Sequence, residues 1–258
     1  MLSFKTVTLF TLAFLVIGLC FFFLGIIPFW VIFIGIALWL ILTGLGSAFI
    51  GWNYHFKSVL SNPNEKENRV AITFDDGPNQ NITPKVLDLL DKYNAKATFF
   101  CIGKHIETSP NIFKTIINKG HTVGNHTYSH TNTFGFFSTK EVIAELKQTN
   151  QIIFKQSGLK ANLYRPAFGV TNPNIKRAIK HLSLKSIGWN KRSLDTTSLS
   201  EKTVLNRITA NLQPGDIILL HDTSEKSLRV LEQLLLFLEK KQFKSVTVDQ
   251  LCNLKPYA

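Results

Sequence analysis

The sequence predicts an α/β protein: an incomplete, distorted β/α barrel with about seven parallel strands, preceded by an N-terminal transmembrane helical hairpin. From residue 69 onward, short apolar runs typical of strands alternate with segments of helical periodicity. This alternation predicts parallel strands joined by helical crossovers. Before residue 57 the only charged side chain is Lys5. We therefore expect a membrane anchor over residues 1–56, a polar linker over 57–68 and one α/β domain over 69–258.

The anchor is predicted from one long apolar run. No Asp, Glu, Lys, Arg or His occurs between Thr6 and Tyr54. As a single helix this run of about 49 residues would extend roughly 74 Å, far more than a hydrocarbon core of about 30 Å. Two spans fit, with the break at Gly25–Pro28. The alternatives are one span plus a buried core helix, or a signal peptide, whose apolar region of about 7 to 15 residues is shorter.

Seven apolar segments are expected to form the strands. They are short, and they end at Gly, Pro or polar residues. In chain order they are Arg69–Phe74, Ala97–Ile102, His121–Asn125, Leu163–Pro166, Leu184–Trp189, Ile217–Leu220 and Ser245–Val248.

Helical segments separate these strands. We expect Thr83 to be an N-cap, with a proline at the first helical position. Ser138 and Ser198 are each followed three residues later by Glu, the spacing of a capping box. The helices are expected near residues 83–90, 112–120, 138–158, 175–182, 198–212 and 228–238.

Two polar motifs follow strands and suggest a metal site. The segment Thr73–Pro78 carries adjacent carboxylates, Asp75 and Asp76. Adjacent strand residues point opposite ways, so one acid can hold a metal while the other takes a proton. His126 and His130 follow the third strand, and two His with one Asp leave open positions, as in a catalytic zinc site. Taken alone, an Asp-Asp-Gly-Pro run is a turn, and this His pair lacks the Glu of the zinc-protease helix.

Two further polar segments, Tyr164–Gly169 and Leu219–Asp222, also end predicted strands. In parallel barrels the functional residues gather at the C-terminal ends of the strands. The sequence therefore predicts one site built from Asp75, Asp76, His126, His130, Arg165 and His221.

In this order the motifs resemble those of the polysaccharide deacetylases with the NodB homology domain, carbohydrate esterase family four. The resemblance covers roughly residues 69–249 and includes four motifs of that family. Thr73–Pro78 is similar to the first motif, His126–His130 to the second, Arg165–Gly169 to the third and Leu219–His221 to the fifth.

The resemblance implies a hydrolase of the cell envelope that removes acetyl groups from N-acetylated sugars of a peptidoglycan or chitin-like polysaccharide. It assigns one divalent ion, Zn²⁺ first and Co²⁺ or Ni²⁺ as alternatives, to Asp76, His126 and His130. It makes Asp75 the general base and His221 the general acid. The alternatives are hydrolysis of another acetyl ester or non-sugar C–N bond, and a catalytically silent glycan-binding protein.

The same resemblance assigns supporting roles. Arg165 would orient Asp75, and the backbone N–H of Phe168 would bind the oxyanion. Leu219 would line an acetyl pocket, and Pro166 and Trp189 complete the expected substrate contacts. Asp222 is expected only to cap the next turn.

One segment departs from the family. After Trp189 the family has an acidic segment that closes with Asp-Trp, whereas this chain has Asn190–Thr196. Asp195 is retained and is our candidate to polarise His221. Arg192 stands in place of the earlier Asp, and Thr196 in place of the Trp. We therefore expect a groove wall without an aromatic platform.

The charge of the chain bears on its partners. The net charge is +12, which favours anionic lipid or an anionic glycan nearby. Lys and Arg are scattered over expected helix faces, so no nucleic acid partner is expected, and no feature indicates a protein partner. Three cysteines make no disulfide framework.

The expected location is a membrane crossed by two spans. Lys5 and Lys57, which flank the hairpin, weakly favour a cytoplasmic domain under the positive-inside rule. Envelope glycans lie outside the cytoplasm, and this consideration makes an extracytoplasmic catalytic domain the stronger expectation. The expected partners are thus an acetylated glycan and the lipid bilayer.

Overall fold

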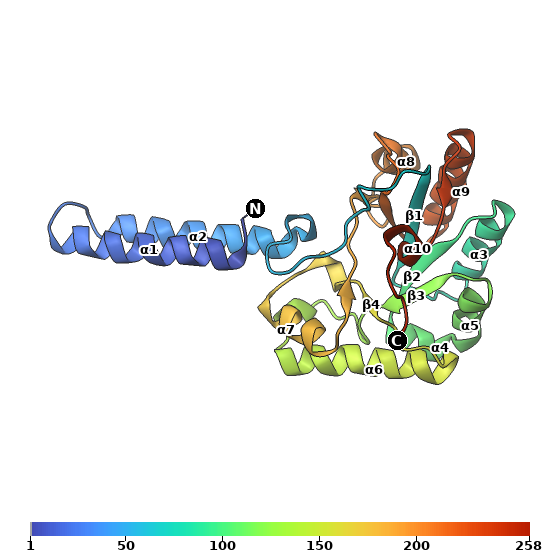
Figure 1. The fold of residues 1–258 in the computed structure, drawn as a ribbon, viewed down its shortest axis with the longest axis horizontal. Coiled ribbons are helices and arrows are strands. Elements are labelled where there is room, and N and C mark those ends of the chain that lie inside the picture. The colour runs from blue at the N-terminus through green and yellow to red at the C-terminus, as the bar shows by residue number, and fades with distance from the viewer. Residues whose placement is uncertain (1) are drawn as a thin grey trace.

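Two apolar helices extend from one side of an α/β body in the computed structural model, which describes residues 2–258 (Figure 1). Helix α1 (Phe4–Phe23) begins after Ser3, whose side chain accepts a hydrogen bond from the backbone of Thr6. The chain turns at Gly25, where φ is 70°, and returns as α2 (Trp30–Ala48). Only 11 % of the apolar window of each helix is buried, and both are long and apolar enough to cross a membrane.

The hairpin is joined to the body by direct contacts. The backbone N–H of Thr171 donates to the carbonyl of Ser47, at the end of α2, over 2.9 Å. Tyr54 packs on Gly46, where a Cβ would lie 2.4 Å from the ring. The 3₁₀ turn η1 (Ile50–Trp52) connects the two parts. The segment predicted as a linker also lies along the body, since Val59 pairs with Ile187 and Ser61 pairs with Asp216.

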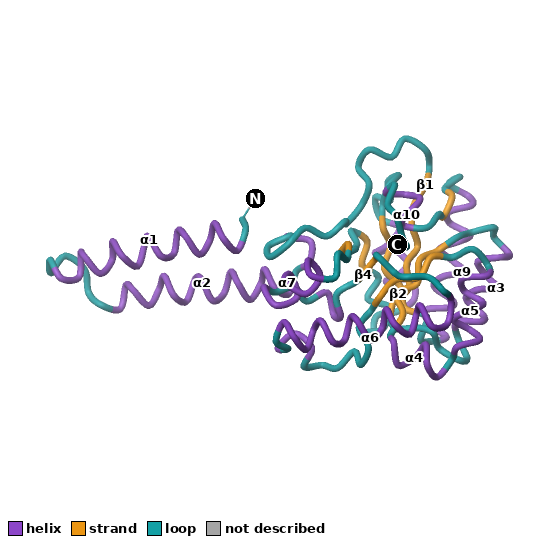
Figure 2. Tube along the Cα trace, turned by 60° about the horizontal axis from the view of Figure 1, so that its bottom comes forward, coloured by secondary structure: helices purple, strands orange, loops and turns teal. Residues whose placement is uncertain are grey.

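The sheet confirms the predicted half-barrel. Its strand order is β5-β4-β3-β2-β1-β7-β6, with β8 paired to the beginning of β1, and the strand pairs are parallel. Figure 2 shows the strands grouped in the middle of the body with helices around them. The strands are β1 (Arg69–Asp75), β2 (Ala97–Cys101), β3 (Thr122–Asn125), β4 (Leu163–Tyr164), β5 (Lys185–Ser186), β6 (Lys191–Arg192), β7 (Ile217–His221) and β8 (Lys244–Ser245).

Two strand predictions need correction. The two-residue strand β6 was not predicted, because its charged residues become a strand only by pairing with β7. The predicted strand Ser245–Val248 keeps only Ser245, and helix α10 (Val248–Cys252) begins where the strand was expected to end. An apolar run this short does not distinguish a strand from a buried helical turn.

The helices match the predicted segments, with two additions, one of which is α10. The capping box at Ser138 is present, since its side chain and that of Glu141 bond each other's backbone N–H groups. The short helix α4 was not predicted. The helices of the body are α3 (Thr83–Lys92), α4 (Gly103–Thr108), α5 (Pro110–Asn118), α6 (Thr139–Ser157), α7 (Pro173–His181), α8 (Glu201–Thr209) and α9 (Glu225–Lys240).

Two predicted caps are wrong. Ser200, not Ser198, caps α8 by accepting from the backbone of Thr203. Thr83 is the first helical residue of α3, and its hydroxyl is already used as a donor to the carboxylate of Asp222. At Thr83, the buried carboxylate of Asp222 competes with the helix end for the hydroxyl.

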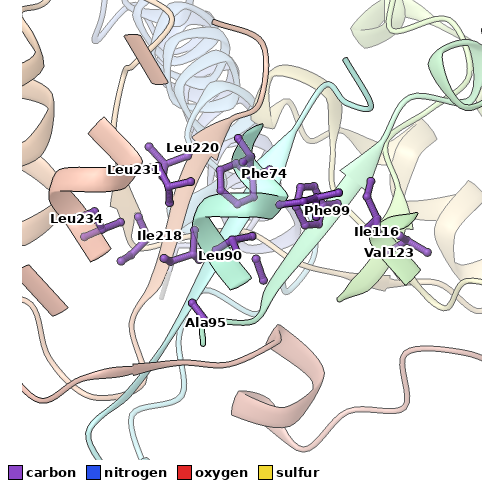
Figure 3. Close-up of a cluster of buried hydrophobic side chains, with 14 of the residues drawn as sticks. Phe74, Leu90, Ala95, Phe99, Ile116, Val123, Ile218, Leu220, Leu231 and Leu234 are labelled. Carbon is purple, nitrogen blue, oxygen red and sulfur yellow. The ribbon is translucent and has the colours of Figure 1, made fainter. Parts of the chain in front are cut away.

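A core between the sheet and its outer helices fixes the strands (Figure 3). Phe74 and Phe99, on neighbouring strands, stack with ring centroids 5.0 Å apart. Leu231 and Leu234 of α9 lie in the same buried cluster. This packing holds the end of β1, where the two adjacent carboxylates emerge.

Candidate active site

The buried pair of Asp75 and Arg165 forms the base of the site. Asp75 ends β1 and is 4 % exposed, while Arg165 follows β4 and is 0 % exposed. Nη1 of Arg165 donates to Oδ1 of Asp75 over 2.8 Å and to the hydroxyl of Thr73 over 2.7 Å. Its Nη2 donates to the carbonyl of Gly188 over 2.8 Å, and the guanidinium lies 4.1 Å from the ring centroid of Phe100. Asp75 is therefore held in one orientation.

The next residue, Asp76, faces two imidazoles. Its backbone is in the left-handed region, with φ of 74°, which turns its side chain away from the path of the strand. Nε2 of His126 and Nε2 of His130 each lie 3.4 Å from Oδ1 of Asp76. Burial works against ionisation, but the neighbouring imidazoles outweigh it and hold the pKa of Asp76 well below its usual range.

This trio fits a divalent cation. Its ligand atoms lie within 4.8 Å of one another. Oδ1 of Asp76 is buried without a hydrogen-bond partner, an arrangement that proteins avoid unless an ion or water completes it. Burial and the charge of His126 lower the pKa of His130 to about 4, so its ring is neutral and free to coordinate. One carboxylate and two imidazoles are a donor set that suits zinc and its neighbours.

Remote elements orient these three side chains. Nδ1 of His126 lies 2.9 Å from the carbonyl of Arg165 and must donate to it, which leaves Nε2 to face Asp76. His105 of α4 donates from Nδ1 to the backbone carbonyl of Asp76 over 2.7 Å. Glu145 of α6 accepts from the N–H groups of residues 128 and 129, between the two histidines, at 2.9 and 2.8 Å. Sequence reasoning missed His105 and Glu145, since neither stands in a motif.

His221 ends β7 directly beside Asp75 in the register of the sheet. Its Nδ1 lies 2.8 Å from Oδ1 of the fully buried Asp195, and its Nε2 lies 4.0 Å from Oδ2 of Asp76. Burial disfavours the charged ring, but Asp195, aided by Asp75 and Asp76, raises the pKa of His221 to about 9. The imidazolium therefore persists at neutral pH, with Nε2 facing the site. Ser193 and Ser227, which sequence reasoning also missed, donate to Asp195 over 2.8 Å each.

A cavity of about 260 Å³ lies over these groups. Phe168, Trp189 and Leu219 line it, as does Arg192. Phe168 is 47 % exposed, and its ring centroid lies 4.4 Å from that of His130. Pro166 is buried and stands outside the cavity lining.

The expectation of a wall without aromatic side chains is wrong. Thr196 does line the cavity without an aromatic ring, but Trp189 and Phe168 supply rings from other segments. Gly169 permits this arrangement, since a Cβ there would lie 2.8 Å from the indole of Trp189.

The prediction that Asp222 caps the next turn is also wrong. Ser224 caps α9 by accepting from the backbone of Ser227. Asp222 is instead fully buried behind the carboxylate turn, where it accepts from the hydroxyl of Thr83, and burial raises its pKa to about 7. A Cβ on Gly77 would lie 2.3 Å from its Oδ2, so the turn after Asp76 needs glycine to lie this close.

Known proteins are similar to this chain in sequence and in fold. The family model described as polysaccharide deacetylase matches residues 62–187. A peptidoglycan-N-acetylglucosamine deacetylase of Bacillus cereus is 33 % identical over 204 residues, which cover 78 % of this chain and 74 % of that protein. The peptidoglycan-N-acetylmuramic acid deacetylase PdaA of Bacillus subtilis is 30 % identical over 195 residues, which cover 73 % of each.

Solved structures agree with the sequence matches. The crystal structure of the Bc1960 peptidoglycan N-acetylglucosamine deacetylase superposes with a TM-score of 0.72 at 32 % identity, covering 78 % of this chain and 95 % of that one. The peptidoglycan deacetylase PdaC from Bacillus subtilis gives a TM-score of 0.68 at 32 % identity, covering 74 % and 92 %. This chain therefore belongs to the polysaccharide deacetylase family, carbohydrate esterase family four.

Proposed function

We propose that this protein is a metal-dependent hydrolase that removes acetyl groups from N-acetylated sugars of peptidoglycan. The observation that carries the proposal is the meeting of three functions in one cavity. A base candidate, an acid candidate and an Asp-His-His trio all open into the same space at the ends of the strands. The two relatives described above are both named peptidoglycan deacetylases, and these names support the choice of glycan.

Asp76, His126 and His130 would hold the divalent ion, Zn²⁺ first, with Co²⁺ and Ni²⁺ as alternatives. When bound, the ion supplies a Lewis acid that polarises the acetyl carbonyl and lowers the pKa of water to about 7. The buried Oδ1 of Asp76, which has no hydrogen-bond partner, supports this assignment.

The residues of the chain would divide the proton transfers. Asp75, fixed by Arg165, takes the proton of the attacking water. His221 holds a proton on Nε2, beside the trio, and gives it to the leaving amine nitrogen. The N–H of Phe168 is assigned to the developing oxyanion.

The cavity would receive the sugar that carries the acetyl group. Leu219, on the strand between β1 and β6, gives an apolar surface for the methyl group. Trp189 and Phe168 offer rings against the sugar, whose axial hydrogens pack well on aromatic faces.

We also propose that residues 1–56 anchor the protein in a bilayer as two spans, that 57–68 lead into the catalytic domain over 69–258, and that this domain lies outside the cytoplasm. The exposed apolar surface of α1 and α2 supports the anchor. The extracytoplasmic side follows from the location of peptidoglycan. A reporter fused after Ala258 tests the side, and a fusion active only in the cytoplasm would overturn it.

The catalytic assignment is tested by comparing Asp75→Asn with His126→Ala. Asp75→Asn is expected to keep its metal, measured by mass spectrometry, and to lose about 10²- to 10⁴-fold of acetate release from peptidoglycan. His126→Ala is expected to lose both. Matched controls are Asp88→Asn and His181→Ala, at exposed positions on α3 and α7, which should behave as the parent. An active Asp75→Asn enzyme would contradict the base assignment, and a fully metallated His126→Ala would contradict the ligand assignment.

A further inference from the structure

We propose that Arg192 forms an anion-binding subsite at the catalytic cavity, which selects N-acetylated sugars that carry a carboxylate or phosphate close to the acetamide. The inference deepens the proposed function and rests on it. It starts from a residue that this chain places beside the acid candidate and that the mechanism does not use.

The backbone places Arg192 next to the reacting groups. Arg192 ends β6 and pairs with Leu219 of β7, two residues before His221. Its side chain lines the same cavity as Asp76 and His221. The guanidinium lies 5.8 Å from the ring centroid of Trp189, over whose ring it is placed. A substrate in the cavity therefore comes within reach of this cation.

The guanidinium has no acidic partner. Across residues 2–258, no carboxylate oxygen lies within the 4.0 Å of an ion pair with Arg192, whereas Arg165 and Arg229 each have such a partner. Asp75 in the cavity is engaged by Arg165. Asp195, only three residues along the chain, is fully buried, and its oxygens accept from His221 and two serines. The donors of Arg192 are thus available to a ligand.

Chemistry favours an anion as that ligand. The planar guanidinium presents paired N–H donors that match the two oxygens of a carboxylate or phosphate. The neighbouring lining residues of the same loop, Leu194 and Thr196, carry no charge to compete with it. Arg192 is exposed to solvent, and it also lines the cavity, where a cleft concentrates the field of its charge on a bound anion.

The test compares oligosaccharides of equal length that differ in one substituent. One is a neutral N-acetylglucosamine oligomer, one carries lactyl carboxylates on alternate sugars, as in peptidoglycan glycan strands, and one carries sugar phosphates. Acetate release gives kcat/KM for each with the full chain in detergent. For Arg192→Gln, the ratio of kcat/KM for an anionic oligosaccharide to kcat/KM for the neutral one is expected to fall about 10- to 100-fold. This is the loss expected for one charge-assisted hydrogen-bond pair.

Two variants sharpen the result. Arg192→Lys keeps the positive charge but lacks the paired N–H donors of the guanidinium. Its ratio of kcat/KM values should therefore lie between those of the parent and Arg192→Gln. Arg207→Gln removes the same charge from an exposed position on α8 and should leave the ratio as in the parent. The carboxylate and phosphate arms identify the preferred anion. An unchanged ratio in Arg192→Gln overturns the subsite.

Binding separates this proposal from the proposed function. If no glycan releases acetate, the proposed function fails, and calorimetric titration with the same three oligosaccharides then judges Arg192 alone. Tighter binding of an anionic oligosaccharide, weakened by added salt and lost in Arg192→Gln, supports the subsite. Equal affinity for charged and neutral oligosaccharides refutes it.

Discussion

Replacing Arg165 by Met tests how the site holds its base. Arg165 is fully buried, and its side chain donates to Asp75, to a hydroxyl and to two backbone carbonyls. Met fills a similar space but donates no hydrogen bond. Asp75, only 4 % exposed, would lose its cationic partner and stay buried. Breaking a buried ion pair from one side costs about 3–5 kcal/mol of the free energy of unfolding.

Removing the charge of Asp75 instead should lower the free energy of unfolding by a smaller amount. In Asp75→Asn, Arg165 keeps the hydroxyl of Thr73 and the carbonyls of Ile187 and Gly188 as acceptors. We expect a loss of about 1–3 kcal/mol, the cost of one disrupted buried hydrogen-bond pair. The double variant Asp75→Asn/Arg165→Met has no unpaired charge, so its loss should be smaller than the sum of the single losses by about 2 kcal/mol.

Thermal unfolding of the full chain in detergent measures these losses. For a domain of this size, 1 kcal/mol shifts Tm by about 2–4 °C, so Arg165→Met should lower Tm by about 6–20 °C. Arg207→Met, the same change at an exposed position, should shift Tm very little. A Tm for Arg165→Met within about 2 °C of the parent, or strictly additive losses in the double variant, would refute the reasoning.

Three further changes probe other parts of the molecule. Asp195→Asn removes the charge that raises the pKa of His221 to about 9, so the imidazolium is lost at lower pH. The alkaline limb of the kcat/KM profile should then move to lower pH with metal content unchanged, and a fixed limb would argue against His221 as the acid. Burial lowers the pKa of His121 from 6.5 to about 4. Between these pH values the unfolded chain is protonated at His121, whereas the folded protein is not. The stability that this buried neutral ring contributes is therefore full above pH 6.5 and is lost as the pH falls toward 4, by up to about 3 kcal/mol. In His121→Asn, the free energy of unfolding measured in urea should vary less with pH between 4 and 6.5. An unchanged pH dependence in this variant would exclude His121 as the cause. Gly46→Leu should displace the hairpin from the body, because even a Cβ at this position would lie 2.4 Å from the ring of Tyr54. Protease cleavage within residues 49–56 should then be faster. Gly44→Leu, whose Cβ would meet no atom within 4 Å, should leave the cleavage rate unchanged.

The sequence by itself determined the parts that depend on local order. Apolar runs such as Arg69–Phe74 and Ile217–Leu220, bounded by polar or turn-forming residues, are typical of buried parallel strands, and parallel topology brings their C-terminal ends to one edge. For this reason Asp76, His126 and His221 could be expected together before any coordinates were known. The capping box at Ser138 and the turn at Gly25 are equally local, since each depends on residues within one turn of the chain.

Only the tertiary structure decided which remote groups complete these motifs. Glu145, on α6, steadies the loop between the two histidines, and nothing in its neighbourhood along the chain marks it. Asp222 accepts the hydroxyl hydrogen of Thr83, because a carboxyl group this deeply buried needs a hydrogen-bond donor. Such contacts join residues far apart in sequence, and their geometry exists only after the sheet and its helices have packed.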